Sequence, residues 1–305
     1  MDWLNAPASQ QAGLLAEVGW VLVAGAALIF LLTMGLLALA LRRRKREIPT
    51  AWWTVGAGIA FPSVVLGALL AYAVLRTAAL ERPPIGAPVV IGLTGHLWWW
   101  EIRYHDPASG RWIIGANELH LPAGRPVQLG LQSADVIHSF WVPTLGGKMD
   151  LVPGRTNRLF ITALAPGVHR GVCAEYCGTQ HARMALHVVV ETPEQFDRWL
   201  AAQSAAAPAP TNATLERSRR AFLDHGCAGC HVVRGVAEGA SLGPDLTHVG
   251  SRLYLGAGTL PNDRDALARW IANPQDFKPG ARMPSFQHLD RETLDALADY
   301  LSHLR

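Results

Sequence analysis

Charge is scarce in this sequence and is absent from two long stretches. Only 17% of the 305 residues are Asp, Glu, Lys or Arg, and the formal net charge of +3 gives no case for a nucleic-acid partner. Half of the residues are hydrophobic and the mean hydropathy is positive, which indicates membrane segments. After Glu17 no charge occurs up to Leu41, and none occurs from Trp52 to Leu75. Each stretch exceeds the roughly 20 residues that a helix needs to cross hydrocarbon.

Basic residues are missing before the first stretch and concentrated after it. The N-terminal segment before Glu17 contains no Lys or Arg and can cross the membrane, whereas residues 42–46 are Arg-Arg-Arg-Lys-Arg and belong in the cytoplasm. The sequence thus predicts a transmembrane hairpin over residues 1–80, with helices at about 17–41 and 52–75 and both ends outside. The lack of a basic start and the long apolar core favour a retained helix over a cleaved signal peptide.

Cysteine is also scarce, with four residues in two close pairs and none left over. The first pair lies in residues 173–184, which read Cys-Ala-Glu-Tyr-Cys-Gly-Thr-Gln-His-Ala-Arg-Met. Thiolate, imidazole and thioether suit copper, and a second Cys one loop turn away would let two thiolates bridge two metals. A further His is needed, and His138, in Asp-Val-Ile-His-Ser-Phe-Trp, is well placed. A disulfide between Cys173 and Cys177 and a zinc site are the alternative interpretations.

This loop, Cys-x-Glu-x-Cys-x-x-x-His-x-x-Met, together with the upstream His-Ser-Phe-Trp, resembles the dinuclear copper (CuA) site of cytochrome c oxidase subunit II. The resemblance implies ligation by five side chains and by the backbone carbonyl of the Glu. The implied ligands are His138, Cys173, Glu175, Cys177, His181 and Met184.

The same resemblance implies further roles around the copper site. The carboxylate of Glu175 would face a magnesium ion shared with subunit I, and Trp98 would be the point where electrons enter. A fused electron donor would move that point, so this role of Trp98 stays open. In many members of the family a Glu near the inner end of the second helix opens a proton path. Glu47 is the only acid nearby here and is interpreted as a solvated loop charge.

Short apolar runs separated by Gly and Pro fill residues 81–200. Val127, Leu129 and Leu131 alternate with polar or small residues, as expected for a half-buried strand, and several such runs predict an all-β sandwich. The resemblance implies a cupredoxin-like domain with His138 on one loop and the two Cys on another loop at the same end. A stiff sheet scaffold would hold the ligands in nearly fixed geometry.

Residues 201–214 lack large apolar side chains and predict a semi-flexible tether. Beyond it, residues 227–231 read Cys-Ala-Gly-Cys-His, the motif for attachment of a c-type haem. The thiols of Cys227 and Cys230 would form thioethers with the haem, and His231 would become an axial iron ligand. Such attachment happens on the oxidising side of a membrane.

Methionine is rare after the copper motif, because Met283 is the only one beyond residue 184. We therefore predict Met283 as the second axial ligand, which would raise the haem potential, with His248 and His288 as alternatives. Amphipathic stretches with acidic starts predict helices, and residues 215–305 resemble an all-α class I cytochrome c domain.

As a whole, the chain resembles subunit II of a haem-copper oxidase with a fused cytochrome c, the caa type. The resemblance implies that the chain passes electrons from a cytochrome c, or from a quinol-cytochrome c reductase, through its haem and its copper pair to subunit I, which reduces oxygen to water. It implies subunits I and III as partners, and a bacterial plasma membrane location with both termini and both metal domains on the periplasmic side.

The sequence contains no candidate oxygen site of its own, so the partner would set the reaction. A nitric oxide reductase with a copper-bearing subunit and a membrane-tethered electron shuttle without an oxidase partner are the alternatives. A quinol oxidase subunit is disfavoured, because such subunits lack the copper ligands.

Overall fold

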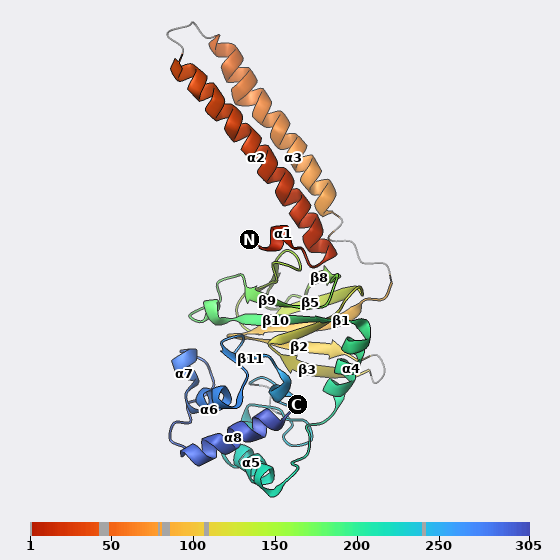
Figure 1. The fold of residues 1–305 in the computed structure, drawn as a ribbon, viewed down its shortest axis with the longest axis vertical. Coiled ribbons are helices and arrows are strands. Elements are labelled where there is room, and N and C mark those ends of the chain that lie inside the picture. The colour runs from red at the N-terminus through yellow and green to blue at the C-terminus, as the bar shows by residue number, and fades with distance from the viewer. Residues whose placement is uncertain (1, 43–48, 79, 81–85, 107–109, 240–241) are drawn as a thin grey trace.

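The computed structural model consists of a helical hairpin, a two-sheet sandwich and a small helical domain (Figure 1). The hairpin extends from one side of the sandwich, and the C-terminal helical domain lies on the other side (Figure 1). The structure describes residues 2–42, 49–78, 80, 86–106, 110–239 and 242–305.

The hairpin is formed by two long apolar helical segments. The short α1 (Asp2–Asn5) precedes α2 (Gln10–Arg42), and the return segment begins as a π-helix, η1 (Trp52–Ala60), and continues as α3 (Phe61–Thr77). The two segments, of 33 and 26 residues, are long and apolar enough to cross a membrane. Most of the basic loop lies outside the described residues, and so does Glu47. We assign no proton-path role to Glu47.

The first helix begins earlier than the expected residue 17, because its first turns rest on the sandwich. The hydroxyl of Ser9 donates to the carbonyl of Leu145 at 2.6 Å, and the Gln11 side chain accepts from the backbone N–H of Thr162 at 3.0 Å. Ala12 and Ala16 in the next turns are buried. These contacts anchor the hairpin to the domain that it would carry.

The sandwich contains two five-stranded sheets, with strand orders β3-β2-β1-β5-β8 and β4-β10-β9-β6-β7. The β1–β5 and β4–β10 pairs are parallel and the other pairs are antiparallel. The strands are β1 (Val89–His96), β2 (Trp99–His105), β3 (Trp112–Ala116), β4 (Glu118–Pro122), β5 (Val127–Ser133), β6 (His138–Trp141), β7 (Met149–Leu151), β8 (Asn157–Ile161), β9 (Gly167–Cys173) and β10 (Ala185–Glu191).

Alternating side chains build the core between these sheets. Val127, Leu129 and Leu131 in β5 are at most 1% exposed, whereas Gln132 on the opposite face is exposed. Burial of each such apolar side chain contributes about 1.5–3 kcal/mol. The helix α4 (Pro193–Ser204) follows β10 and buries Phe196 against the same core.

The C-terminal domain is mainly helical. Its helices begin at side-chain caps that satisfy free backbone N–H groups: Asn212 before α5, Asp263 before α6 and Asp290 before α8. Helix α8 packs against α5 and α6 around a buried core. The elements are α5 (Ala213–Asp224), η3 (Cys227–Gly229), η4 (Val249–Ser251), β11 (Tyr254–Leu255), β12 (Leu260–Pro261), α6 (Arg264–Ala272), α7 (Pro274–Phe277) and α8 (Arg291–His303).

The segment expected to be a tether over residues 201–214 is shorter than its composition suggested, because α4 extends to Ser204 and α5 begins at Ala213. The segment between them is also held. The backbone N–H of Ala207 donates to the carbonyl of Arg234 at 3.0 Å, and the Arg234 guanidinium donates to the carbonyl of Ala205 at 3.2 Å. Both bonds are accepted by main-chain carbonyl oxygens. Such contacts cannot be predicted from amino-acid composition.

Candidate metal centres

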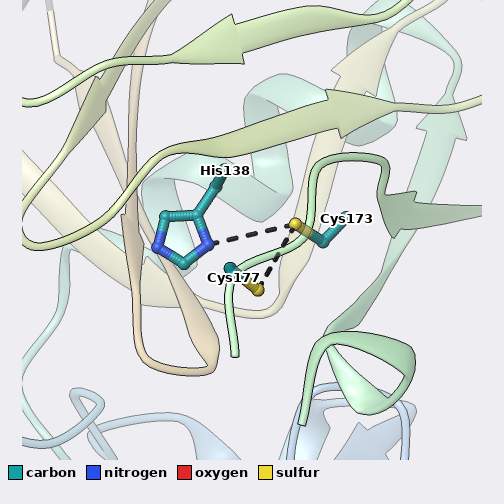
Figure 2. Close-up of side chains that lie close together, drawn as sticks. All are labelled: His138, Cys173 and Cys177. Atoms are coloured by element: carbon teal, nitrogen blue, oxygen red, sulfur yellow. Dashed lines mark hydrogen bonds between the residues drawn. The ribbon is translucent and has the colours of Figure 1, made fainter. Parts of the chain in front are cut away.

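Sulfur and nitrogen atoms converge at one end of the second sheet. Figure 2 shows the His138 ring and the Cys173 and Cys177 thiols pointing toward one another. The Cys173 Sγ lies 3.9 Å from the His138 Nδ1 and 3.7 Å from the Cys177 Sγ. The Cys177 Sγ in turn lies 3.7 Å from the His181 Nδ1 and 3.8 Å from the Met184 Sδ.

Strand pairing and one tight loop bring these side chains together. His138 begins β6 and Cys173 ends β9, its neighbour in the sheet. The loop from Cys173 doubles back, because the backbone N–H of Cys173 donates to the carbonyl of Met184 at 2.9 Å. Gly178, at φ +112°, adopts a conformation inside this loop that favours glycine. The loop also brings the carbonyl of Glu175 to 3.2 Å from the Cys173 Sγ.

Asp135 orients the one ligand that comes from outside this loop. Its carboxylate lies 2.8 Å from the Nε2 of His138 and accepts from the backbone N–H of Leu97 at 2.8 Å. An Nε2–H donated to Asp135 leaves the Nδ1 lone pair facing the sulfurs. Gly95 permits this position, because a Cβ there would be 2.7 Å from the Cδ2 of His138.

The electrostatics of the thiols favour a metal-binding state. The hydrogen bond between the two sulfurs lowers the pKa of Cys173 to about 3, against the effect of burial, and raises the pKa of Cys177. One thiolate is therefore available near neutral pH, and thiolate is the form that binds metal.

The donor set fits a pair of copper ions better than the two alternatives. The sulfurs are 3.7 Å apart, far beyond the roughly 2.05 Å of a disulfide. A structural zinc ion takes about four ligands in a tetrahedron, whereas two thiols, two imidazoles, a thioether and a carbonyl converge here. Soft sulfur and imidazole donors in this number suit two coppers that share thiolates.

Trp98 lies between the loop over residues 173–184, called the copper loop below, and the C-terminal domain. Its Nε1 donates to the carbonyl of Cys177 at 2.9 Å. On the other side, a Cβ at Gly280 would be 3.7 Å from its Cη2 atom, which is ordinary contact. Of the two following residues, Trp99 stacks on a His ring and Trp100 is fully buried. The C-terminal domain therefore covers part of the side chain that was expected to meet an external donor.

The carboxylate of Glu175 is partly open to solvent. It is 44% exposed and lies 3.7 Å from the ammonium group of Lys148. The backbone and the side chain of this residue can therefore serve two different partners.

His231 lies in a site that fits a haem. The turn η3 places Cys227 and Cys230 directly after α5, and the Nδ1 of His231 lies 2.8 Å from the carbonyl of Pro244. A hydrogen bond there leaves Nε2 as the iron-binding atom. Burial lowers the pKa of His231, which keeps the ring neutral. Gly243 leaves room for the ring, because a Cβ there would be 2.6 Å from its Cε1.

Met283 packs against the same core as the haem motif, whereas the two alternative ligands have other surroundings. Met283 and Cys227 are both partly buried against the core of the C-terminal domain. The Nε2 of His248 lies instead 3.2 Å from the carbonyl of Ala205, and His288 is exposed. Met283 is therefore the better candidate for the second axial position.

Two residues next to these centres were not predicted from the sequence. Asp135 lies three positions before His138, a spacing that could have suggested it. Lys278 is buried between the two domains, yet in the stretch Asp-Phe-Lys-Pro-Gly it has the pattern of a solvated turn lysine. Only the packing of the domains reveals it.

The fold and the sites define a chain in which a cupredoxin-like sandwich joins a helical cytochrome c domain and carries two apolar N-terminal helices. Residues 106–192 match the family model of the cytochrome c oxidase subunit II periplasmic domain, and residues 215–305 match that of cytochrome c. The chain thus contains a subunit II periplasmic domain and a cytochrome c domain, and these two families imply copper and haem as cofactors.

Proteins with similar sequences are named cytochrome c oxidase subunit 2. The chain is 38% identical to cytochrome c oxidase subunit 2 of Alkalihalophilus pseudofirmus over 73% of its length, and 34% identical to that of Bacillus sp. (strain PS3) over 71%. The match spans 64% and 62% of the length of these two relatives. The crystal structure of the subunit II periplasmic domain (CoxB) of Bradyrhizobium japonicum covers 39% of this chain and 95% of that chain, at 29% identity and a TM-score of 0.37.

Proposed function

We propose that this chain is the electron-input subunit of a haem-copper terminal oxidase. The observation that carries the proposal is the position of Trp98, which bonds to the copper loop through its Nε1 and to Lys278 of the C-terminal domain through its backbone carbonyl. A single aromatic residue thus links the domain with the predicted copper ligands to the domain with the predicted haem ligands. When bound, the haem and the copper pair would each supply reversible one-electron chemistry.

Each predicted ligand has a place in this proposal. His138, Cys173, Cys177, His181, Met184 and the carbonyl of Glu175 would hold the two coppers. Cys227 and Cys230 would hold the haem covalently, with His231 and Met283 on its iron. The measured separations, at most 3.9 Å between neighbouring donor atoms of the copper site, support the first set.

The proposed direction of electron flow is from the haem domain to the copper domain. Electrons from a cytochrome c, or from a quinol-cytochrome c reductase, would arrive at the haem domain and pass through Trp98 to the copper site. Trp98 would then act as an internal relay rather than as the docking point of an external donor, because the chain's own Gly280 lies against it.

From the copper site, electrons would leave for subunit I, where oxygen would be reduced to water. The exposed carboxylate of Glu175 would face subunit I and a magnesium ion at that interface. Subunit III would join through the membrane. The two apolar helices would anchor the chain in a bacterial plasma membrane, with both metal domains and both termini on the periplasmic side.

The test is a metal count on the full-length chain, purified from a membrane in which haem can be attached. We expect two coppers and one haem per chain, and a paramagnetic resonance spectrum of one unpaired electron shared by two coppers. Cys177→Ser should remove this copper signal and leave the haem spectrum unchanged. A chain that binds haem but no copper, or zinc in its place, would contradict the proposal.

A further inference from the structure

Lys278 is a buried lysine that bridges the two metal-binding domains. It follows α7 and is only 4% exposed. Its Nζ donates to the carbonyl of Gly256 in its own domain at 3.0 Å, and to the carbonyls of Trp98 and Arg183 in the sandwich domain at 2.7 and 2.8 Å. An ammonium group has three N–H donors, so each one has a partner.

The residues on either side of Lys278 are also bonded to the copper loop, residues 173–184. The Gln180 side chain, from the copper loop, donates to the carbonyl of Pro279 at 2.7 Å. The guanidinium of Arg183 donates to the carbonyl of Phe277. The residues before and after Lys278 thus each accept a hydrogen bond from the copper loop, and Lys278 returns one to it.

The contact continues from Lys278 to Met283 through Gln275. The Gln275 side-chain oxygen accepts from the backbone N–H of Gly280 at 2.7 Å, and its nitrogen donates to the carbonyl of Met283 at 3.2 Å. Gly280 is also the residue that lies against Trp98. A displacement of Lys278 would therefore move the surface that covers Trp98 and the backbone that carries Met283.

We propose that Lys278 is a positioning residue that holds the Met283 loop against Trp98 and the copper loop. This inference rests on the proposed function, because it concerns how fast the haem site and the copper site of that function exchange electrons. With both groups bound, the transfer would move one electron and no proton, from a ferrous haem, which would become ferric, to the copper pair, which would be reduced by one electron. Lys278 contacts neither metal site directly and would act only through the position of the loop.

Burial explains why this contact depends on a lysine. Burial lowers the pKa of Lys278 to about 7, and the ammonium form offers one N–H to each of the three carbonyl oxygens. If the ammonium is removed, the carbonyls of Trp98 and Arg183 lose that donor while the domains stay docked. Loss of a donor at a part-buried carbonyl is costly, so the change weakens the docking of the two loops.

The test is Lys278→Met in the full-length, metal-loaded chain, since methionine keeps the unbranched shape without the donors. After photoreduction of the haem, we expect electron transfer to copper to slow by about tenfold or more. Hydrogen exchange should rise in peptides that cover residues 177–184 and 277–283. The haem potential and the copper resonance signal should not change, because no ligand is altered.

Arg282→Met is the matched control. It removes the same charge from the same loop, but Arg282 is exposed. It should leave the transfer rate and the hydrogen exchange at their wild-type values. If Lys278→Met does not assemble, Lys278→Gln keeps two N–H donors and should give an intermediate loss of rate.

The inference would be overturned if Lys278→Met, or Lys278→Gln in its place, kept the wild-type electron-transfer rate and the wild-type hydrogen exchange. It would also be overturned if Arg282→Met slowed electron transfer equally. The third contrary result is a shift in the haem potential that explains the slower rate. A failure of the proposed function would be seen earlier and separately. In that case the wild-type chain, with both centres loaded, would show no transfer from haem to copper.

Discussion

Gly95→Ala should weaken the copper site selectively, by pushing His138 out of position. A Cβ at residue 95 would lie 2.7 Å from the Cδ2 and 3.0 Å from the Cγ of His138. Ordinary contact begins at about 3.4 Å, so the ring must move by about 0.7 Å. The ring is fully buried and its Nε2 is only 2.8 Å from Asp135, so no free space receives it.

The expected magnitude follows from these two constraints. Overpacking of a filled core costs about 1–3 kcal/mol, and loss of the hydrogen bond to Asp135, which involves a charged group, costs a similar amount. Disturbance of a group that orients a metal ligand typically lowers metal affinity by about 10- to 100-fold. We expect a loss of copper affinity in that range, with haem content unchanged.

Gly92→Ala is the control on the same strand, β1. A Cβ there would meet its nearest neighbour, the Cβ of Arg103, at 3.6 Å, which is ordinary contact. Both changes restrict the unfolded chain equally, so this effect cancels in the comparison. The assay is a copper titration of each full-length variant, followed by paramagnetic resonance. Equal copper affinity in the two variants would refute the reasoning.

Three further predictions follow from the remaining sites. Met283→Leu should leave the haem attached but lower its reduction potential in a redox titration, and a wild-type potential would mean that another group binds the iron. Gly243→Ala should disturb the haem spectrum by displacing His231, because its Cβ would be 2.6 Å from the ring, and a wild-type spectrum would contradict this. Burial lowers the pKa of His120, but its hydrogen bonds to the carboxylates of Glu118 and Glu191 outweigh burial and raise the pKa above its usual value. The stability from this group is therefore fully present below about pH 6.5 and is lost as pH rises through the raised pKa. The melting temperature of His120→Gln should lack that part of the pH dependence. If the melting temperature of the variant depends on pH as in the wild type, His120 does not contribute this stability.

The sequence predicted best what is encoded locally. The loop over residues 173–184 carries most of the copper donors within one short segment, so its spacing alone indicates the site. The helices of the cytochrome domain were also predicted, because Asp263 and Asp290 cap amphipathic stretches. In the sandwich, the strands with apolar runs, such as β5, follow their alternating pattern.

Features that depend on distant partners were not predicted. β4 contains Glu118 and His120, which look solvated in the sequence but are buried or nearly so, because the His120 ring bonds to Glu118 on one side and to Glu191, on the neighbouring β10, on the other. The docking surface around Lys278 joins segments about 95 and 180 positions apart in the chain. No local pattern encodes such pairs.

The most direct test of the account is a single-turnover measurement on the full-length, metal-loaded chain. The haem is photoreduced, and the absorption bands of haem and copper are followed at several protein concentrations. We expect the haem to be reoxidised as the copper is reduced, one electron for one, at a rate independent of protein concentration. A rate that rises in proportion to concentration, or a haem that stays reduced beside oxidised copper, would contradict it.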